Sequence, residues 1–366
     1  MRISNLWLQL HDLGAKPCHV DRVLRGWSQV ISYDTVHSPA DNFFPLRLRE
    51  GLPALESALA NLAQVQGEYP ANTEVARLLV KLSDGQLTES VLLPRGGLCV
   101  STQVGCAVGC VFCMSGRSGL IRQLGSAEIV AQVVLARQRR AVSKVVFMGM
   151  GEPAHNLDNV LEAIDLLGTQ GNIGHKNLVL STVGDVRVFE RLMVGVDGTS
   201  PLANPLPHTG EGVKVARRKV AVKPALALSL HSTDAALRAE LLPNAPPIPV
   251  EELVARAEDY ARATGYPTQY QWTLLAGIND SDAELARIVA LLTGKYAVMN
   301  FIPFNEVDGL TYRRPSAERI ADMAIRLNKQ GIYTRVRDSA GQEIEGACGQ
   351  LRARAEKAPR SPKFVR

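Results

Sequence analysis

Four of the six cysteines in the sequence lie between residues 99 and 113, in a stretch that also contains glycines. Three of them, Cys106, Cys110 and Cys113, follow the spacing Cys-x3-Cys-x2-Cys, and Cys99 precedes them. Three thiolates are too few to close a structural zinc site, which needs four ligands in a tetrahedron. They suit a [4Fe-4S] cluster in which one iron stays open for another ligand. A zinc knuckle with a remote fourth ligand and three unrelated buried thiols are the alternatives.

The spacing of these cysteines, with the aromatic Phe112 before the last one, resembles the motif of the radical S-adenosylmethionine (SAM) superfamily. In that superfamily the fourth iron binds the amino and carboxylate groups of SAM. The string Gly149-Met-Gly-Glu-Pro153 resembles the superfamily segment that contacts the SAM amino group, and the resemblance implies that Gly151 and Glu152 bind this cofactor. On its own, a Gly-rich turn of this kind is usually only a turn.

The chain has 366 residues and a formal net charge of +5. This length predicts one large catalytic domain with a small appended domain. No stretch is long and apolar enough for a membrane span, and the first residues lack the apolar core of a signal peptide. We therefore expect a cytoplasmic protein without membrane contact, in a reducing compartment that keeps its thiols available for iron.

Basic residues cluster near both ends of the chain. Residues 1–65 have helical periodicity interrupted by prolines, and they predict a helical accessory domain whose interleaved Lys and Arg side chains are compatible with nucleic-acid binding. The family resemblance described below implies that this domain binds RNA. Residues 352–366 form a basic tail with six cations and one carboxylate. A solvated helix face and a disordered terminus are the alternatives for these two regions.

The pattern changes to β structure after residue 65. Residues 66–98 predict a linker, Gln66–Pro70, followed by a β-hairpin extension whose turn is Asp84-Gly85. From residue 99 to 351, short apolar strands alternate with helices, one of which Ser126 is predicted to cap. This alternation predicts an α/β fold with a parallel sheet covered by helices. The number and order of strands fit an open (β/α)6 barrel of the radical SAM type, a partial barrel.

In a barrel of parallel strands the chemistry lies at the carboxyl ends of the strands. Polar residues and glycines follow the apolar runs at these ends, where a polar cofactor could be held. Besides Gly151 and Glu152, the candidate SAM-binding residues are Ser181, Ser229, Leu230, His231 and Asn300.

Further strings narrow the resemblance to one family, the RlmN/Cfr RNA methyltransferases. They are Cys99, Val-Phe-Met-Gly-Met-Gly-Glu-Pro, Leu-Ser-Leu-His, Asn-Phe-Ile-Pro-Phe-Asn and Gly346-Ala-Cys348-Gly-Gln-Leu351. The resemblance covers roughly residues 74–351, and a generic radical SAM enzyme has no reason to carry Cys99 or Cys348. The resemblance implies methylation of an adenine ring carbon in ribosomal or transfer RNA, and it favours C2 over C8 as that carbon.

The family resemblance also implies roles for individual residues. Cys348 takes a methyl group from one SAM, and a deoxyadenosyl radical from a second SAM removes hydrogen from that methyl group, so that its carbon adds to the base. Glu89 then removes the ring proton as general base, and Cys99 attacks Cys348 to form a transient disulfide that releases the product. A radical route is needed because the adenine carbon is electrophilic, whereas SAM normally methylates nucleophiles.

Each of these assignments has an alternative. Cys348 could be a buried small residue, Cys99 could be a fourth cluster ligand, and Glu89 could be a solvated charge at the start of a strand.

An extra segment around residues 196–218 leaves the identity of the RNA open. A radical SAM enzyme acting on a substrate other than RNA and a non-catalytic, metal-containing RNA-binding module are the alternative functions. For the enzyme we expect a monomer with one cluster per chain, which receives electrons from a flavodoxin-type or other one-electron donor.

Overall fold

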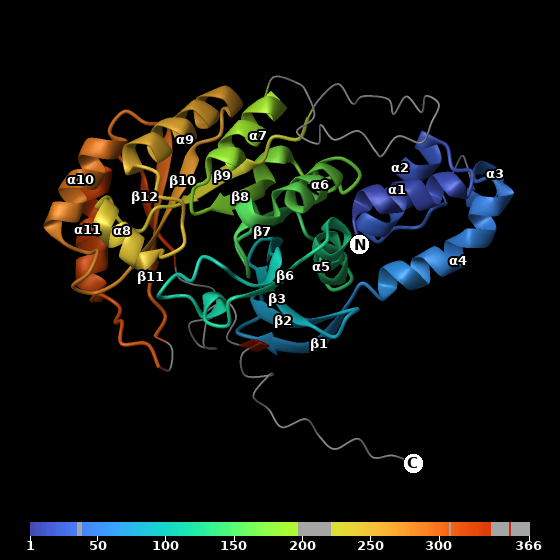
Figure 1. The fold of residues 1–366 in the computed structure, drawn as a ribbon, viewed down its shortest axis with the longest axis horizontal. Coiled ribbons are helices and arrows are strands. Elements are labelled where there is room, and N and C mark those ends of the chain that lie inside the picture. Colours follow the sequence, from blue (N-terminus) through green and yellow to red (C-terminus); the bar gives the residue numbers. More distant parts are fainter. Residues whose placement is uncertain (35–38, 197–220, 307–308, 338–350, 353–366) are drawn as a thin grey trace, which may run out of the picture.

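The computed structural model describes residues 1–34, 39–196, 221–306, 309–337 and 351–352. Cys348, the basic tail after Arg352 and nearly all of the extra segment around residues 196–218 lie outside these residues. In the described part, ten strands form one sheet in the order β1-β2-β3-β4-β7-β8-β9-β10-β11-β12 (Figure 1).

The strands from β4 to β12 pair in parallel, as the alternating pattern predicted. They are β4 Gly97–Cys99, β7 Lys144–Phe147, β8 Leu178–Thr182, β9 Ala225–Ser229, β10 Thr268–Leu274, β11 Ala297–Pro303 and β12 Thr334–Val336. The helices between them are α5 Ser126–Arg137, α6 Leu157–Gly168, α7 Val186–Val196, α8 Ala235–Leu241, α9 Val250–Thr264, α10 Asp282–Leu292 and α11 Ala317–Lys329. They run along the outer side of the curved sheet (Figure 1). The predicted α/β partial barrel is therefore confirmed.

The two faces of this sheet have different neighbours, because successive side chains of a strand point to opposite faces. On the outer face, residues such as Leu98 and Val145 belong to the large apolar core that includes the helices. On the inner face a second, smaller cluster contains Val75, Val91, Cys99, Val146, Val179, Ala225 and Ala227. Cys99 therefore faces the inside of the barrel.

The N-terminal helices α1 Ile3–Asp12, α2 Pro17–Gln29, α3 Ala40–Phe43 and α4 Leu46–Ala60 form the predicted helical domain (Figure 1). Ser126 joins this domain to the barrel, because its Oγ accepts a 2.8 Å hydrogen bond from the Ile3 N–H and donates to the carboxylate of Glu162. The prediction that Ser126 caps α5 is wrong, since Gly125 occupies the N-cap position. The Ser126 hydroxyl is used for docking between domains instead.

The β extension is larger than the sequence predicted. Strand β1, Ala63–Pro70, pairs antiparallel with β2, Ala76–Leu82, so the interpretation of Gln66–Pro70 as a linker is wrong. Gly67 and Pro70 suggested a loop, but an edge strand tolerates both residues, and the register of β1 shifts between Val65 and Gly67. Strand β3, Leu87–Leu93, pairs antiparallel with both β2 and β4 and makes the extension continuous with the barrel.

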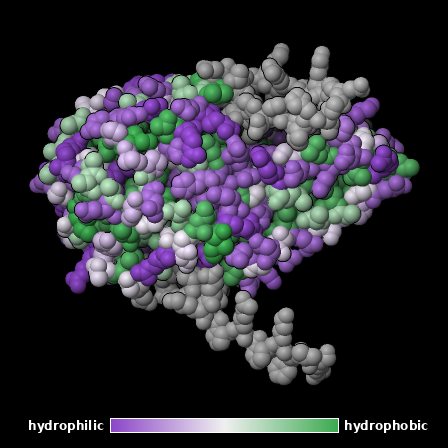
Figure 2. Space-filling model, viewed as in Figure 1, coloured by the Kyte–Doolittle hydropathy of each residue, from purple (hydrophilic) through white to green (hydrophobic). Residues whose placement is uncertain are grey.

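Several elements were not predicted. A two-stranded sheet of β5 Gln103–Gly105 and β6 Leu120–Gln123 flanks the cysteine segment, and α7 and α8 were missed. Strand β6 carries two exposed apolar side chains, Leu120 and Ile121, and an apolar patch lies in that region of the surface in Figure 2. None of the helices in the described ranges has the length and apolar character needed to span a bilayer.

Candidate cluster and cofactor site

The segment from Cys106 to Cys113 is held by the end of helix α8 and the residues after it. The Val111 N–H donates a 3.1 Å hydrogen bond to the carbonyl of Leu241, and the Asn244 N–H donates one of 3.1 Å to the carbonyl of Val108. The Asn244 side chain adds a 2.9 Å bond to the carbonyl of Ala107. These bonds fix the backbone of the loop, so its cysteines are positioned by tertiary contacts and not by regular secondary structure.

The environment of the three cysteines fits a bound cation. Burial raises the pKa of Cys106 to about 11, and burial together with the neighbouring Cys113 and Cys106 raises the pKa of Cys110. The backbone N–H groups of Val108 and Gly109 act in the opposite direction and favour the Cys106 thiolate. Without a cation the site therefore favours neutral thiols, whereas iron would stabilise thiolates.

The arrangement fits an iron-sulfur cluster better than a zinc ion. Within the described ranges, no three or more His, Cys, Asp or Glu side chains surround a position for a single metal ion. A zinc ion with Zn–S bonds of about 2.3 Å would draw thiolate sulfurs to within about 3.8 Å of one another. In a [4Fe-4S] cluster each thiolate binds a different iron, so the sulfurs stay further apart. Cys106, Cys110 and Cys113 would hold such a cluster.

The turn after β7 brings Glu152 close to the cysteines. Gly151 has φ +105°, and a Cβ atom there would lie 2.6 Å from the side chain of Gln103, so this position requires glycine. Glu152 is 4% exposed, and its two carboxylate oxygens accept 3.0 Å hydrogen bonds from the N–H groups of Ala154 and Val183. Burial raises the pKa of this carboxyl group. The remaining acceptor capacity of the carboxylate suits an ammonium group, whose charge would offset the cost of burial.

His231 lies against the cysteine loop in a constrained conformation. Its φ is +62°, in the left-handed region that residues with a Cβ seldom adopt, and its ring contacts that of Phe112 with centroids 4.8 Å apart. Burial lowers the pKa of His231 to about 3, and its Nδ1 accepts a 3.0 Å hydrogen bond from the Thr273 N–H. The ring is therefore neutral and carries its proton on Nε2. The preceding Leu230 is fully buried in the large apolar core.

A row of polar side chains crosses the inner face of neighbouring strands. Ser229 pairs in register with Gln271, and Gln271 pairs with Asn300. Asn300 is 1% exposed, yet neither its Nδ2 nor its Oδ1 has a hydrogen-bond partner among the residues that the structure describes. Ser181, 9% exposed, lies on the same inner face of β8. An unpartnered buried amide costs about 1–3 kcal/mol, so Asn300 fits a site built for a polar ligand such as SAM.

Glu89 lies within β3 and is buried, with 3% of its surface exposed, so it is not a solvated charge. Its Oε2 is 3.9 Å from Nη1 of Arg77, which is 1% exposed. Its Oε1 accepts a 2.9 Å hydrogen bond from the N–H of Arg352. Arg352 follows Cys348 by four residues, so the chain after Cys348 reaches Glu89.

Cys99 and Glu89 share the inner face of the sheet. Cys99 pairs in register with Val91 on β3, and Glu89 is two residues from Val91 on the same strand. Cys99 is 7% exposed and belongs to the inner apolar cluster, whereas Cys106 and Cys110 pack against a different cluster. This placement favours a role of Cys99 beside Glu89 over a role as a fourth iron ligand.

Arg238 on α8 is a site residue that the sequence did not predict. It is 5% exposed and donates hydrogen bonds to the carbonyls of Val183 and Ser229. Val183 follows β8, and Ser229 is the last residue of the neighbouring strand β9. Burial lowers its pKa to about 10, while the charges of Cys110 and Glu152 act in the opposite direction. The positive charge of Arg238 therefore lies near Cys110 of the cysteine loop and Glu152 of the turn after β7. No motif surrounds Arg238 in the sequence, so only the structure identifies it.

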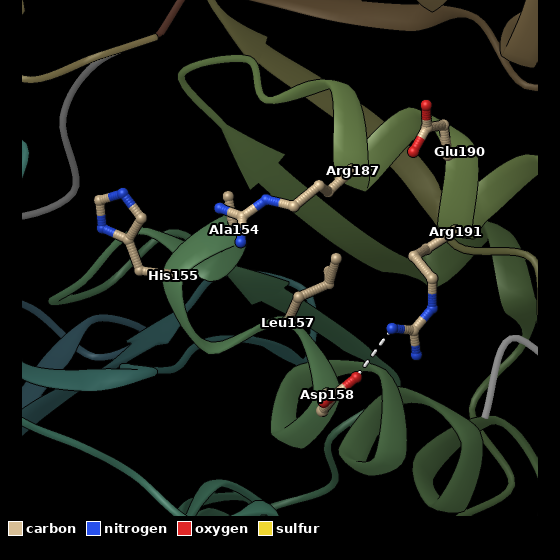
Figure 3. A pocket seen from close by; sticks show the side chains of 7 residues that line it. All are labelled: Ala154, His155, Leu157, Asp158, Arg187, Glu190 and Arg191. Carbon is tan, nitrogen blue, oxygen red and sulfur yellow. Dashed lines mark hydrogen bonds and ion pairs between the residues drawn. The ribbon is translucent and has the colours of Figure 1, made fainter. Parts of the chain in front are cut away.

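A shallow pocket of about 300 Å³ lies beside the turn after β7 (Figure 3). His155 and Ala154 of the turn lie on one side of it, and Arg187 and Arg191 of α7 on the other. Arg191 forms a 2.8 Å ion pair with Asp158. The pocket contains none of the predicted SAM-binding residues, so it is a neighbour of that site and not the site itself.

A partial barrel with three cysteines in a loop after its first strand is the architecture of a radical SAM protein. Residues 100–289 match the Radical SAM superfamily, and the chain belongs to this superfamily. A radical SAM methyltransferase from Sphaerobacter thermophilus, known from a crystal structure, has a similar fold, with a TM-score of 0.74 and 31% sequence identity. The match covers 96% of this chain and 97% of that one.

The chain is also similar over nearly its whole length to proteins named as probable RNA methyltransferases. One from Pseudomonas aeruginosa is 61% identical over 357 residues, covering 97% of this chain and 96% of the relative. Another, from Aromatoleum aromaticum, is 62% identical over 354 residues, covering 97% and 93%. The similarity includes the N-terminal helical domain, so these relatives share the whole domain organisation.

Proposed function

We propose that this chain is a radical SAM RNA methyltransferase of the RlmN/Cfr type. Its substrate would be an adenine ring carbon, C2 rather than C8, in ribosomal or transfer RNA. The names of relatives at about 60% identity support the reaction class. The observation that carries the finer proposal is the hydrogen bond between Glu89 and Arg352, because it brings the chain next to Cys348 toward the inner face that also holds Cys99.

The site divides into groups that hold the cofactors and groups that act on the base. Cys106, Cys110 and Cys113 would hold a [4Fe-4S] cluster. The residues that would hold SAM are Gly151, Glu152, Ser181, Ser229, Leu230, His231 and Asn300. When bound, these cofactors supply a methyl group and a radical that removes hydrogen from it. The enzyme would act in the cytoplasm as a monomer and receive electrons from a one-electron donor such as a flavodoxin.

Three residues of the chain would act on the base. Cys348 carries the methyl carbon on its sulfur until that carbon is bonded to the RNA. Glu89 accepts the proton that the ring carbon loses. The Cys99 thiol then loses its proton, and its sulfur forms a bond with the Cys348 sulfur while the bond from that sulfur to the transferred carbon breaks. The carbon keeps the electron pair of the broken bond and takes up a proton to complete the methyl group, which frees the RNA and leaves a transient disulfide.

A comparison of Cys99→Ala with Cys348→Ala tests this proposal. Without Cys348 no covalent bond between protein and RNA can form. Without Cys99 the adduct forms but is not released, so RNA remains on the denatured Cys99→Ala protein. The double variant is the matched control and retains no RNA.

Four results would contradict the proposal. If Cys99→Ala turns over RNA freely, Cys99 has no role in release, and if it loses iron, Cys99 is a cluster ligand. Deoxyadenosine formation without methyl transfer to RNA by the wild-type protein would indicate a radical SAM enzyme with another substrate. Zinc without iron or sulfide after anaerobic reconstitution would indicate a non-catalytic RNA-binding module. Mass spectrometry of nucleosides from ribosomal and transfer RNA, with and without the gene, would identify the modified base.

A further inference from the structure

Four basic residues from distant parts of the sequence have no acidic partner in the part of the chain that the structure describes. They are Arg95, Lys144, Arg335 and Arg337, and we call them the cation cluster. Within the described ranges none of them forms an ion pair, whereas Arg122, Arg187, Arg319 and Arg326 each pair with a carboxylate. Unpaired cations at one place are a structural cost, because like charges repel.

The four charges are close enough to influence one another. Burial lowers the pKa of Lys144, and the positive charges of Arg337, Arg335 and Arg95 lower it further. Burial and the charge of Arg335 likewise lower the pKa of Arg337. A half-buried lysine among three guanidinium groups needs an anion to offset this repulsion.

Two of the cations are held in place by the turn before β4. Arg95 has φ +56°, a conformation that costs free energy for a residue with a Cβ. The carbonyl of the next residue, Gly96, accepts hydrogen bonds of 3.0 Å from the Ser143 N–H and 3.3 Å from the Lys144 N–H. Arg140 donates to the carbonyls of residues 93 and 97, on both sides of the turn. The turn therefore holds Arg95 beside Lys144 in a strained but fixed conformation.

The other two cations belong to β12 and the residue after it. The Arg335 guanidinium lies over the ring of Tyr333, 4.8 Å from its centroid, and its Nε donates a 3.0 Å hydrogen bond to the Tyr333 hydroxyl. Tyr333 is 52% exposed. Arg337 is tied to β11 by a 2.7 Å hydrogen bond from its N–H to the carbonyl of Phe301. An exposed aromatic ring beside an arginine is a platform on which a nucleobase can stack.

The cation cluster joins strands that are far apart in the sheet. Strand β12 is the last strand of the sheet and pairs only with β11 among the described residues. Lys144 begins β7 and Arg95 precedes β4, near the other end of the parallel part. The positive charges of Arg335 and Arg337 nevertheless lower the pKa of Lys144, so the curvature of the sheet seen in Figure 1 brings these residues near one another.

We propose that the cation cluster binds backbone phosphates of the RNA substrate. The proposal rests on the proposed function only in taking RNA as the substrate. Phosphate is the anion that matches a set of lysine and arginine donors without a structural carboxylate, and Tyr333 adds a surface for a base.

The test measures binding of a fluorescently labelled RNA stem-loop over a series of salt concentrations. The variant Lys144→Met/Arg337→Met removes two cations and keeps similar side-chain volume. The matched control, Lys295→Met/Lys329→Met, removes two exposed lysines that lie outside the cluster. Because each phosphate contact releases counterions, we expect the cluster variant to lower the slope of log affinity against log salt by about 0.7–0.9 per cation. The control should keep the wild-type slope, and both variants should keep their iron and the cleavage of SAM.

Three results would overturn this proposal. The cluster variant could bind the RNA with the same slope as the control. The cluster variant could lose affinity for inorganic phosphate but keep its affinity for RNA, which would indicate a small-anion site. Arg335→Gln could leave RNA binding unchanged in the variant that already lacks Lys144 and Arg337. Failure of the proposed function is distinguished from these results, because it would appear as a wild-type protein that does not methylate RNA.

Discussion

The backbone N–H of Arg352 donates a 2.9 Å hydrogen bond to Oε1 of Glu89, although 263 residues separate the two in sequence. The other oxygen of the same carboxylate lies 3.9 Å from Nη1 of Arg77. Glu89 therefore positions the end of the catalytic domain and also forms a buried ion pair. Any substitution of Glu89 tests its chemistry and its structural contacts together, and the two must be separated.

We expect Glu89→Gln to abolish release of methylated RNA while deoxyadenosine is still formed. The amide oxygen of glutamine can still accept the Arg352 N–H, but it is a far weaker base than a carboxylate. Chromatography of the deoxyadenosine and methylated nucleosides measures both outcomes. Normal amounts of methylated product would show that Glu89 is not the base.

The structural contribution of Glu89 is measured by a second variant. Glu89→Gln leaves the Arg77 guanidinium buried without its counter-charge, which should cost about 3–5 kcal/mol of stability. Arg77→Met/Glu89→Gln removes both charges and should recover most of this loss in urea unfolding, but not the methylated product. Recovery of the product in the double variant would assign the defect of Glu89→Gln to folding alone.

We expect Cys106→Ser, Cys110→Ser and Cys113→Ser each to lose iron and SAM cleavage, because each removes one of the three thiolates that would anchor the cluster. Cys18→Ser is the matched control, since Cys18 is an exposed free cysteine on α2. Iron and sulfide analysis after anaerobic reconstitution measures the effect. A full cluster in any of the three variants would remove that cysteine from the ligand set.

Asn300→Leu should separate cofactor binding from stability. The side chain of Asn300 is buried with both polar atoms unpartnered, so an apolar group of similar size should leave the cofactor-free protein as stable or more stable. The same change should weaken SAM binding by about tenfold or more, which corresponds to at least 1.4 kcal/mol. Thermal unfolding and calorimetric titration with SAM measure the two effects. A loss of stability without loss of SAM affinity would make Asn300 a structural residue.

Lys144 should destabilise the protein at neutral pH, and the effect should decrease as the pH rises. Burial and the neighbouring cations hold the pKa of Lys144 in the folded state below its ordinary value of 10.5, so the unfolded chain binds more protons between these two pKa values. Stability from this group therefore rises with pH in that interval. We expect Lys144→Met to be more stable than the wild type at neutral pH, with a difference that shrinks as the pH approaches 10.5. A difference that is constant with pH would indicate that Lys144 acts through packing and not through charge.

The sequence determined the features that depend on local pattern. The spacing of Cys106, Cys110 and Cys113 indicated the cluster, and the alternation of apolar strands with helices predicted the parallel partial barrel. A strand or helix with a strong apolar period can be recognised from its own residues, which is why this alternation was sufficient. The interpretation of residues 66–70 as a linker failed because edge strand β1 depends on pairing with β2, which no local pattern reveals.

Only the tertiary structure decided which residues meet inside the barrel. The sequence left open whether Glu89 faces solvent, and the pairing of β3 with β4 places it on the same face as Cys99. The contacts of Glu89 with Arg77 and Arg352 and the gathering of the cation cluster depend on strand order, register and sheet curvature. A register shift of one residue would turn these side chains to the opposite face. Their positions are therefore set by the packing of the whole sheet, whereas the cysteine spacing is set by the chain itself.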